Sequence, residues 1–145
     1  MYTIDTWLQE SIPKLTSAGN ESSRLDCLLL LEHAMNTSRE WILAHGDMSV
    51  EPFIGSLDTM LKKRMRHSPI AYITHKKEFF NRTFYITNDV LIPRPESEEI
   101  ITQLLDNTDS RGENEIILDI GTGSGILAIT AKLELPGATV IATDL

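Results

Sequence analysis

The sequence predicts three parts in series: an α-helical bundle, a β-hairpin linker, and the opening of a doubly wound α/β domain. Three observations support this architecture. Apolar residues recur at helical spacing through the N-terminal part, short aromatic strands and prolines follow, and the chain closes with a strand, a glycine cluster, a helix and another strand. We place the boundaries of the three parts at residues 1–73, 74–95 and 96–145.

Helices are predicted along most of residues 1–73. The first covers residues 4–15, and a leucine-rich second helix runs from Glu21 to Met35. Asn36-Thr37-Ser38 supplies a break and an N-cap for a short helix that Gly46 closes. Residues 53–65 form a fourth helix with a basic outer face, and one further turn follows a proline. This pattern is typical of a small helical domain.

Two aromatic runs predict a hairpin in the middle part. Phe79–Phe80 and Phe84–Ile86 flank residues 81–83, which we expect to form the turn although the favoured Asn-Gly pair is absent. Pro93-Arg94-Pro95 can neither continue a helix nor donate to a central strand. We therefore predict a connector at these prolines.

The third part begins with an amphipathic helix that opens at Glu96 and turns four apolar residues inward, namely Ile100, Ile101, Leu104 and Leu105. A polar loop is predicted over residues 109–114. Ile116–Ile120 is a continuous apolar run that predicts a buried strand, residues 126–135 are helical, and Thr139–Thr143 is a second strand. Strand, glycine-rich turn, helix and strand form one βαβ unit with parallel strands.

Charge and composition limit the functional classes. The chain has 145 residues and a net charge of −8, and the whole negative balance lies in the last fifty residues. Residues 62–82 collect seven bases against Glu78 alone, either as a solvated helix face or as a contact for an acidic protein or RNA. No apolar run approaches the ~20 residues of a membrane span. The N-terminus lacks signal-peptide features and Cys27 is the single cysteine, so we expect a cytoplasmic protein.

The strongest chemical signal is the glycine segment between the first strand and its helix: Asp119, Ile120, Gly121, Thr122, Gly123, Ser124 and Gly125. Glycines at this place let the backbone turn sharply and approach a ligand closely. Asp144 ends the next strand, where a carboxylate can accept both hydroxyls of a ribose. The four histidines lack partners at metal-ligand spacing, so no metal site is predicted.

The acid before the glycines indicates which ligand the loop takes. Asp119 would repel a pyrophosphate, whereas it could accept hydrogen bonds from an ammonium group. A nucleoside that carries an amino acid is therefore favoured, and S-adenosylmethionine fits this description. The alternative is a glycine-rich turn that only joins the strand to the helix.

Three segments resemble the peptide chain release factor glutamine N5-methyltransferases: residues 117–125, Ser23–Asp26, and the "LIPRPE" run that begins at Leu91. The resemblance extends over the whole chain and implies a helical N-terminal substrate-recognition domain and a Rossmann-like methyltransferase domain. It also implies S-adenosylmethionine as cofactor and a release factor as protein partner. Two departures concern His75 and Asn81, which stand where glycines are usual.

The resemblance further implies a role for individual residues. Asp119, Gly121 and Gly123 would border the methionine part of the cofactor, Asp144 would hold its ribose, and residues 94–97 would lie near the same pocket. Ile120, Thr122 and Gly125 complete the cofactor-binding set that we predict.

The family's Asn-Pro-Pro-Tyr motif, which grips the substrate amide, does not occur in these 145 residues. An amide nitrogen must be held in line with the methyl group before it can attack. We therefore assign no catalytic residue and expect these residues alone to be inactive. Transfer of labelled methyl to a release factor above a no-enzyme control would contradict this expectation.

Two other functions stay open at this stage. The helical domain alone could be a non-catalytic binding module for a release factor, or the chain could be part of an adenine-N6 methyltransferase that acts on nucleic acid. A two-stranded sheet is marginal by itself. We therefore expect residues 116–143 to be loosely held or to self-associate.

Overall fold

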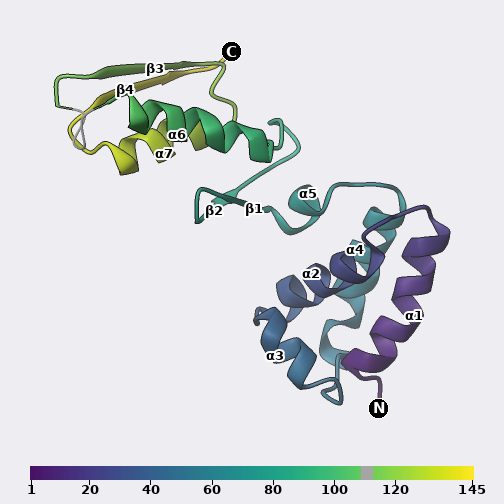
Figure 1. The fold of residues 1–145 in the computed structure, drawn as a ribbon. Coiled ribbons are helices and arrows are strands. Elements are labelled where there is room, and N and C mark those ends of the chain that lie inside the picture. Colours follow the sequence, from purple (N-terminus) through teal and green to yellow (C-terminus); the bar gives the residue numbers. More distant parts are fainter. Residues whose placement is uncertain (109–112) are drawn as a thin grey trace. The chain divides into compact units, whose positions relative to one another are not determined.

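A computed structural model of the chain describes residues 1–108 and 113–145, which form two compact units, Met1–Thr74 and His75–Leu145 (Figure 1). None of the described helices is long and apolar enough to cross a membrane. The elements of the first unit are α1 (Ile4–Ser17), α2 (Ser23–Met35), α3 (Arg39–Ala44), η1 (Glu51–Phe53), α4 (Ile54–Met65) and α5 (Ile70–Thr74). Those of the second are β1 (Lys76–Phe79), β2 (Arg82–Tyr85), η2 (Pro95–Ser97), α6 (Glu98–Asp106), β3 (Ile116–Ile120), α7 (Ile126–Glu134) and β4 (Thr139–Thr143).

Helix ends in the first unit are set by local side chains. The Thr3 hydroxyl accepts from the Thr6 N–H at the start of α1 at 3.3 Å. The cap predicted within residues 36–38 is Ser38, whose hydroxyl accepts from the Trp41 N–H at the start of α3, also at 3.3 Å. Such caps satisfy amides that have no partner within the helix. Asn36 ends α2 in the left-handed region at φ 49°, which asparagine tolerates better than most residues.

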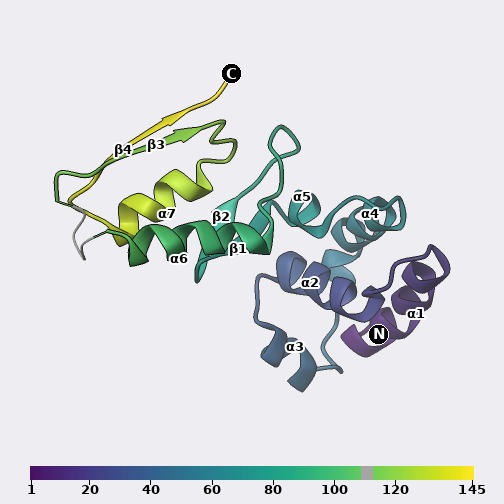
Figure 2. The ribbon, with the colours of Figure 1, turned by 45° about the horizontal axis from the view of Figure 1, so that its top comes forward.

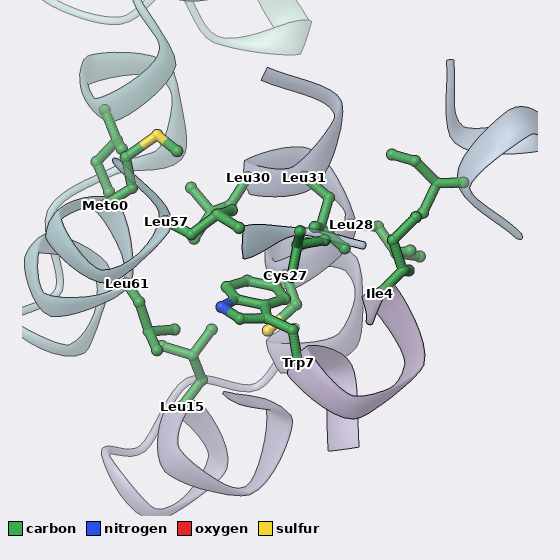
Figure 3. Close-up of a cluster of buried hydrophobic side chains, with 13 residues drawn as sticks. Ile4, Trp7, Leu15, Cys27, Leu28, Leu30, Leu31, Leu57, Met60 and Leu61 are labelled. Carbon is green, nitrogen blue, oxygen red and sulfur yellow. The ribbon is translucent and has the colours of Figure 1, made fainter. Parts of the chain in front are cut away.

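The core of the first unit lies between α1, α2 and α4. The indole of Trp7 occupies its middle and is 1% exposed (Figure 3). Cys27 packs in the same cluster, and burial raises the pKa of its thiol to about 12. A thiol with so high a pKa is a small apolar side chain rather than a nucleophile. Every described residue of this cluster belongs to the first unit.

A buried ion pair joins two of these helices. The Arg64 side chain at the end of α4 donates from Nε to Oδ2 of Asp26 in α2 at 2.7 Å. The other oxygen of Asp26 accepts from the Ser22 hydroxyl, and Arg64 also donates to the Ser68 carbonyl. Only 5% of the Asp26 side chain is exposed, so its carboxylate has lost its water. The ion pair with Arg64 is the main interaction that compensates for this desolvation.

The hairpin turn differs from the one predicted. Strands β1 and β2 pair antiparallel with Phe79 opposite Arg82, so the turn is Phe80-Asn81 rather than residues 81–83. Both turn residues have positive φ, 48° and 59°, as in a two-residue type I′ turn. His75 before β1 is also left-handed at φ 57°, and it is held there by a hydrogen bond between Nδ1 and the Ile86 carbonyl.

We expect Asn81→Gly to raise the free energy of unfolding of the second unit by about 0.5–1 kcal/mol. Glycine adopts this left-handed conformation without the steric cost that asparagine retains. Urea unfolding would measure the change, with Asn81→Ala as the matched variant that lowers stability. A loss of stability in Asn81→Gly would show that the Asn81 side chain, and not its backbone, governs this turn.

The hairpin is anchored on the helices of the second unit (Figure 2). Phe79 is 1% exposed and packs with Ile101 of α6 and with α7. The Phe80 N–H donates to the Glu98 carboxylate at 3.0 Å, and Arg82 pairs with Glu134 at 2.6 Å. These contacts fix the start of α6 and the end of α7 against the same turn.

Strands β3 and β4 form a parallel pair, as predicted, with Asp119 opposite Ala142. Helix α7 packs on one face of this pair and α6 packs on α7. The expectation of a buried strand is wrong for alternate residues, because the second face is exposed: Ile116 is 72%, Leu118 56% and Ile120 78% accessible. Ile100 of α6, predicted to point inward, is likewise 54% exposed. An apolar run cannot reveal which face of a strand another element covers.

The polar loop that we predicted over residues 109–114 falls largely outside the described residues, which resume at residue 113. Asn114 adopts φ 69° in the turn before β3. The loop prediction is otherwise untested.

Candidate functional site

The candidate site lies where the carboxyl ends of β3 and β4 meet the glycine loop, residues 121–125. The Gly121 and Thr122 N–H groups both donate to the Thr143 carbonyl, at 2.9 and 3.0 Å. The Gly125 N–H donates to the Thr122 carbonyl at 2.9 Å, which closes the turn into α7. The backbone of β4 therefore holds the loop that follows β3.

Three glycines of this loop adopt conformations that other residues avoid. Gly121, Gly123 and Gly125 have φ of 76°, 55° and 75°. A Cβ built on Gly121 or Gly123 would meet no atom within 4 Å, whereas one on Gly125 would lie 3.3 Å from the Ile129 side chain. Backbone conformation therefore favours glycine at all three positions, and the space beside Gly121 and Gly123 is open to a ligand.

Asp144 directly contacts the glycine loop. Its Oδ2 accepts from the Gly123 N–H at 2.5 Å and its Oδ1 accepts from the Leu145 N–H at 2.8 Å. These two backbone hydrogen bonds, the one from Gly123 foremost, hold the pKa of Asp144 below its ordinary value. The predicted ribose-binding carboxylate is thus ionised at neutral pH and already engaged with the loop.

The Gly123 contact should titrate with acid. Because the pKa of Asp144 is lowered in the folded chain, the bond is complete above the ordinary value of 3.8 and is lost as pH falls through the lower folded value. We expect the Gly123 amide proton resonance to move with a midpoint below pH 3.8, measured by ¹⁵N-edited NMR. The Gly121 amide, which donates to a carbonyl, is the internal control. A midpoint at or above 3.8, or no titration, would contradict this bond.

Asp119 lies near the end of β3, on the face of the sheet that α7 covers. Its Oδ2 accepts from the Thr122 hydroxyl at 2.7 Å. Ile120, the next residue, points to the exposed face of the sheet. The structure therefore brings Asp119, the glycines and Asp144 together, whereas the Ile120 side chain lies apart from them.

The hydrogen bonds of the loop favour a particular ligand chemistry. Phosphate-binding glycine loops offer free N–H groups to the anion. Here the N–H groups of Gly121, Thr122, Gly123 and Gly125 donate within the chain, and the charged groups that bond the loop are the carboxylates of Asp119 and Asp144. The donor set therefore fits a ligand with an ammonium group and hydroxyls, as S-adenosylmethionine has, better than a pyrophosphate.

Sequence reasoning missed the part played by the main chain of β4. The Thr143 carbonyl accepts from two loop amides, and this contact has no side-chain signature. The segment 94–97, expected near the cofactor pocket, forms η2 and packs against α6, with the Ser97 N–H donating to the Arg94 carbonyl at 3.0 Å.

Two protein-family models match parts of this chain. Residues 98–145 match the family of ribosomal protein L11 methyltransferase (PrmA), so the C-terminal segment is similar to the start of a methyltransferase. Residues 6–74 match the PrmC N-terminal domain. The chain is a relative of the release factor glutamine methyltransferases, and the resemblance seen in its motifs is confirmed.

Three relatives illustrate the similarity. The release factor glutamine methyltransferase of Aliivibrio fischeri is 32% identical over 143 residues, which are 98% of this chain and 50% of the relative. That of Bordetella pertussis is 38% identical over 123 residues, 84% of this chain and 45% of the relative. A bifunctional methyltransferase of Rickettsia bellii is 32% identical over an alignment 170 residues long, which takes in 99% of this chain and 31% of the relative. The chain thus spans half or less of the length of these relatives.

Proposed function

We propose that this chain serves the S-adenosylmethionine-dependent methylation of a glutamine side-chain amide in a peptide chain release factor, in the cytoplasm. The observation that carries the proposal is the pair of carboxylates, Asp119 and Asp144, on either side of a glycine loop in which the Gly121, Thr122, Gly123 and Gly125 amides are bonded internally. Two relatives, which match 98% and 92% of the chain, are named release factor glutamine methyltransferases.

Each residue at the loop has a role in this proposal. Asp119 accepts the ammonium group of the ligand, and the bare backbone at Gly121 and Gly123 lets the methionine part lie against the chain. Asp144 accepts the ribose hydroxyls, for which it gives up the Gly123 N–H. When bound, S-adenosylmethionine supplies an electrophilic methyl group for attack by an amide nitrogen. We assign none of the 145 residues to holding that amide.

The helical unit is proposed to recognise the protein substrate. Lys62, Lys63 and Arg66 are exposed at the end of α4, whereas Arg64 is held inward by Asp26. An acidic patch on the release factor, or ribosomal RNA near it, would complement these three cations. Reversing all three to Glu should weaken release factor binding and reduce its salt dependence. Unchanged affinity at low salt would instead identify a solvated helix face.

Calorimetric titration of S-adenosylmethionine into the 145-residue chain tests the cofactor site. We expect saturable binding that Asp144→Ala and Asp119→Ala each weaken by about tenfold or more, since each removes a charge-assisted contact. Asp106→Ala, in α6, is the control and should bind normally. A chain that binds release factor but shows no saturable binding of S-adenosylmethionine would be a binding module, and the proposal would fail.

A further inference from the structure

The hydroxyl of Thr122 contacts the first carboxylate of the site and not the open space beside the loop. Thr122 Oγ1 donates to Asp119 Oδ2 at 2.7 Å, across three residues of chain. This bond has a charged acceptor and is partly buried, which places it among the stronger side-chain hydrogen bonds. Asp119 Oδ1 makes no hydrogen bond to any described residue, so one oxygen is fixed and the other is available.

The backbone of Thr122 is held by hydrogen bonds at both its N–H and its carbonyl. Its N–H donates to the Thr143 carbonyl at 3.0 Å, and its carbonyl accepts from the Gly125 N–H at 2.9 Å. A β-branched side chain on a fixed backbone has few rotamers to choose from. The direction of the hydroxyl, and through it that of the Asp119 carboxylate, is thereby set by β4 and by the start of α7.

We propose that Thr122 is a positioning residue that turns the free oxygen of Asp119 toward the ammonium group of an amino-acid-bearing nucleoside. The inference rests on the proposed function of the same loop. A neutral hydroxyl suits this task, because it orients the carboxylate and leaves its full negative charge for the ligand, whereas a lysine or arginine would neutralise it. Thr122 thus governs the ammonium end of the ligand and not its nucleoside end.

Two ligands separate this role from a structural one. S-adenosylmethionine carries the ammonium group, and 5′-methylthioadenosine has the same nucleoside without the amino acid. Calorimetry with the 145-residue chain should show that Thr122→Val weakens binding of S-adenosylmethionine about fivefold to tenfold, the loss expected when one orienting side-chain hydrogen bond is removed. Binding of 5′-methylthioadenosine should change less than about twofold. Thr122→Ser, which keeps the hydroxyl, should bind both ligands within about twofold of the unchanged chain.

Thr122→Ala removes the same hydroxyl with a smaller side chain and repeats the test if Thr122→Val unfolds. Equal weakening of both ligands would overturn the inference, because Thr122 would then shape the loop as a whole. Unchanged binding of S-adenosylmethionine in both hydroxyl-free variants would also overturn it. If the unsubstituted chain binds neither ligand, the cofactor site itself fails, which is a different result from failure of the Thr122 variants alone.

Discussion

Replacing Trp7 with alanine is expected to lower the free energy of unfolding of the helical unit by about 3–5 kcal/mol, close to the whole stability of a small unit. The indole is 1% exposed and packs between α1, α2 and α4, so its removal opens a cavity that three helices border (Figure 3). Urea unfolding followed by far-UV circular dichroism measures the change.

Trp41 provides the matched control for Trp7. It lies at the edge of the same cluster, is only partly buried, and stacks on His45 with ring centroids 4.2 Å apart. Trp41→Ala should therefore cost less than half as much as Trp7→Ala. Equal losses in the two variants would mean that the core is not centred on Trp7.

The second large effect concerns the Arg64–Asp26 pair. We expect Arg64→Ala to destabilise the helical unit by about 3 kcal/mol, because it leaves the Asp26 carboxylate buried with the Ser22 hydroxyl as its one remaining partner among the described residues. The Ser68 carbonyl, which joins α4 to α5, loses a donor at the same time.

A second ion pair of the same chemistry is the control. Arg39 meets Glu32 at 2.6 Å, but 40% of the Arg39 side chain and 23% of that of Glu32 are exposed. Arg39→Ala should cost less than about 1 kcal/mol, since water replaces the lost partner. Similar losses for Arg39→Ala and Arg64→Ala would show that burial of Asp26 does not determine the strength of its ion pair.

Much of the fold could be predicted from the sequence, because helical and strand periods are local properties. The helices through Met65 and the parallel β3–β4 pair follow directly from the spacing of apolar residues. The hairpin turn did not, since nothing in Phe80-Asn81 resembles the usual glycine-containing turn. Exposure of Ile100 and Leu118 depends on which faces other elements cover, and that is a tertiary property.

The residues of the candidate site could be predicted from the sequence, but the hydrogen bonds between them could not. Strand, acid and glycines together indicate a ligand loop, and the structure gathers Asp119, Gly123 and Asp144 within it. Asp144 accepts from the Gly123 amide, and the Thr122 hydroxyl donates to Asp119. Both contacts depend on the direction of side chains at a turn, and the spacing of residues along the chain does not determine that direction. Both contacts change the chemistry, because they decide which carboxylate oxygens a ligand can reach.

The central claim is that the loop between β3 and α7 binds S-adenosylmethionine. Its most direct test is an NMR titration of the ¹⁵N-labelled chain with S-adenosylmethionine. The same titration of the Asp144→Ala variant is the matched experiment. We predict saturable shifts at the amides of Gly121, Gly123 and Asp144, with the Gly123 amide moving most as it loses the Asp144 carboxylate. Absence of shifts at these amides, or shifts confined to residues 1–74, would contradict the claim.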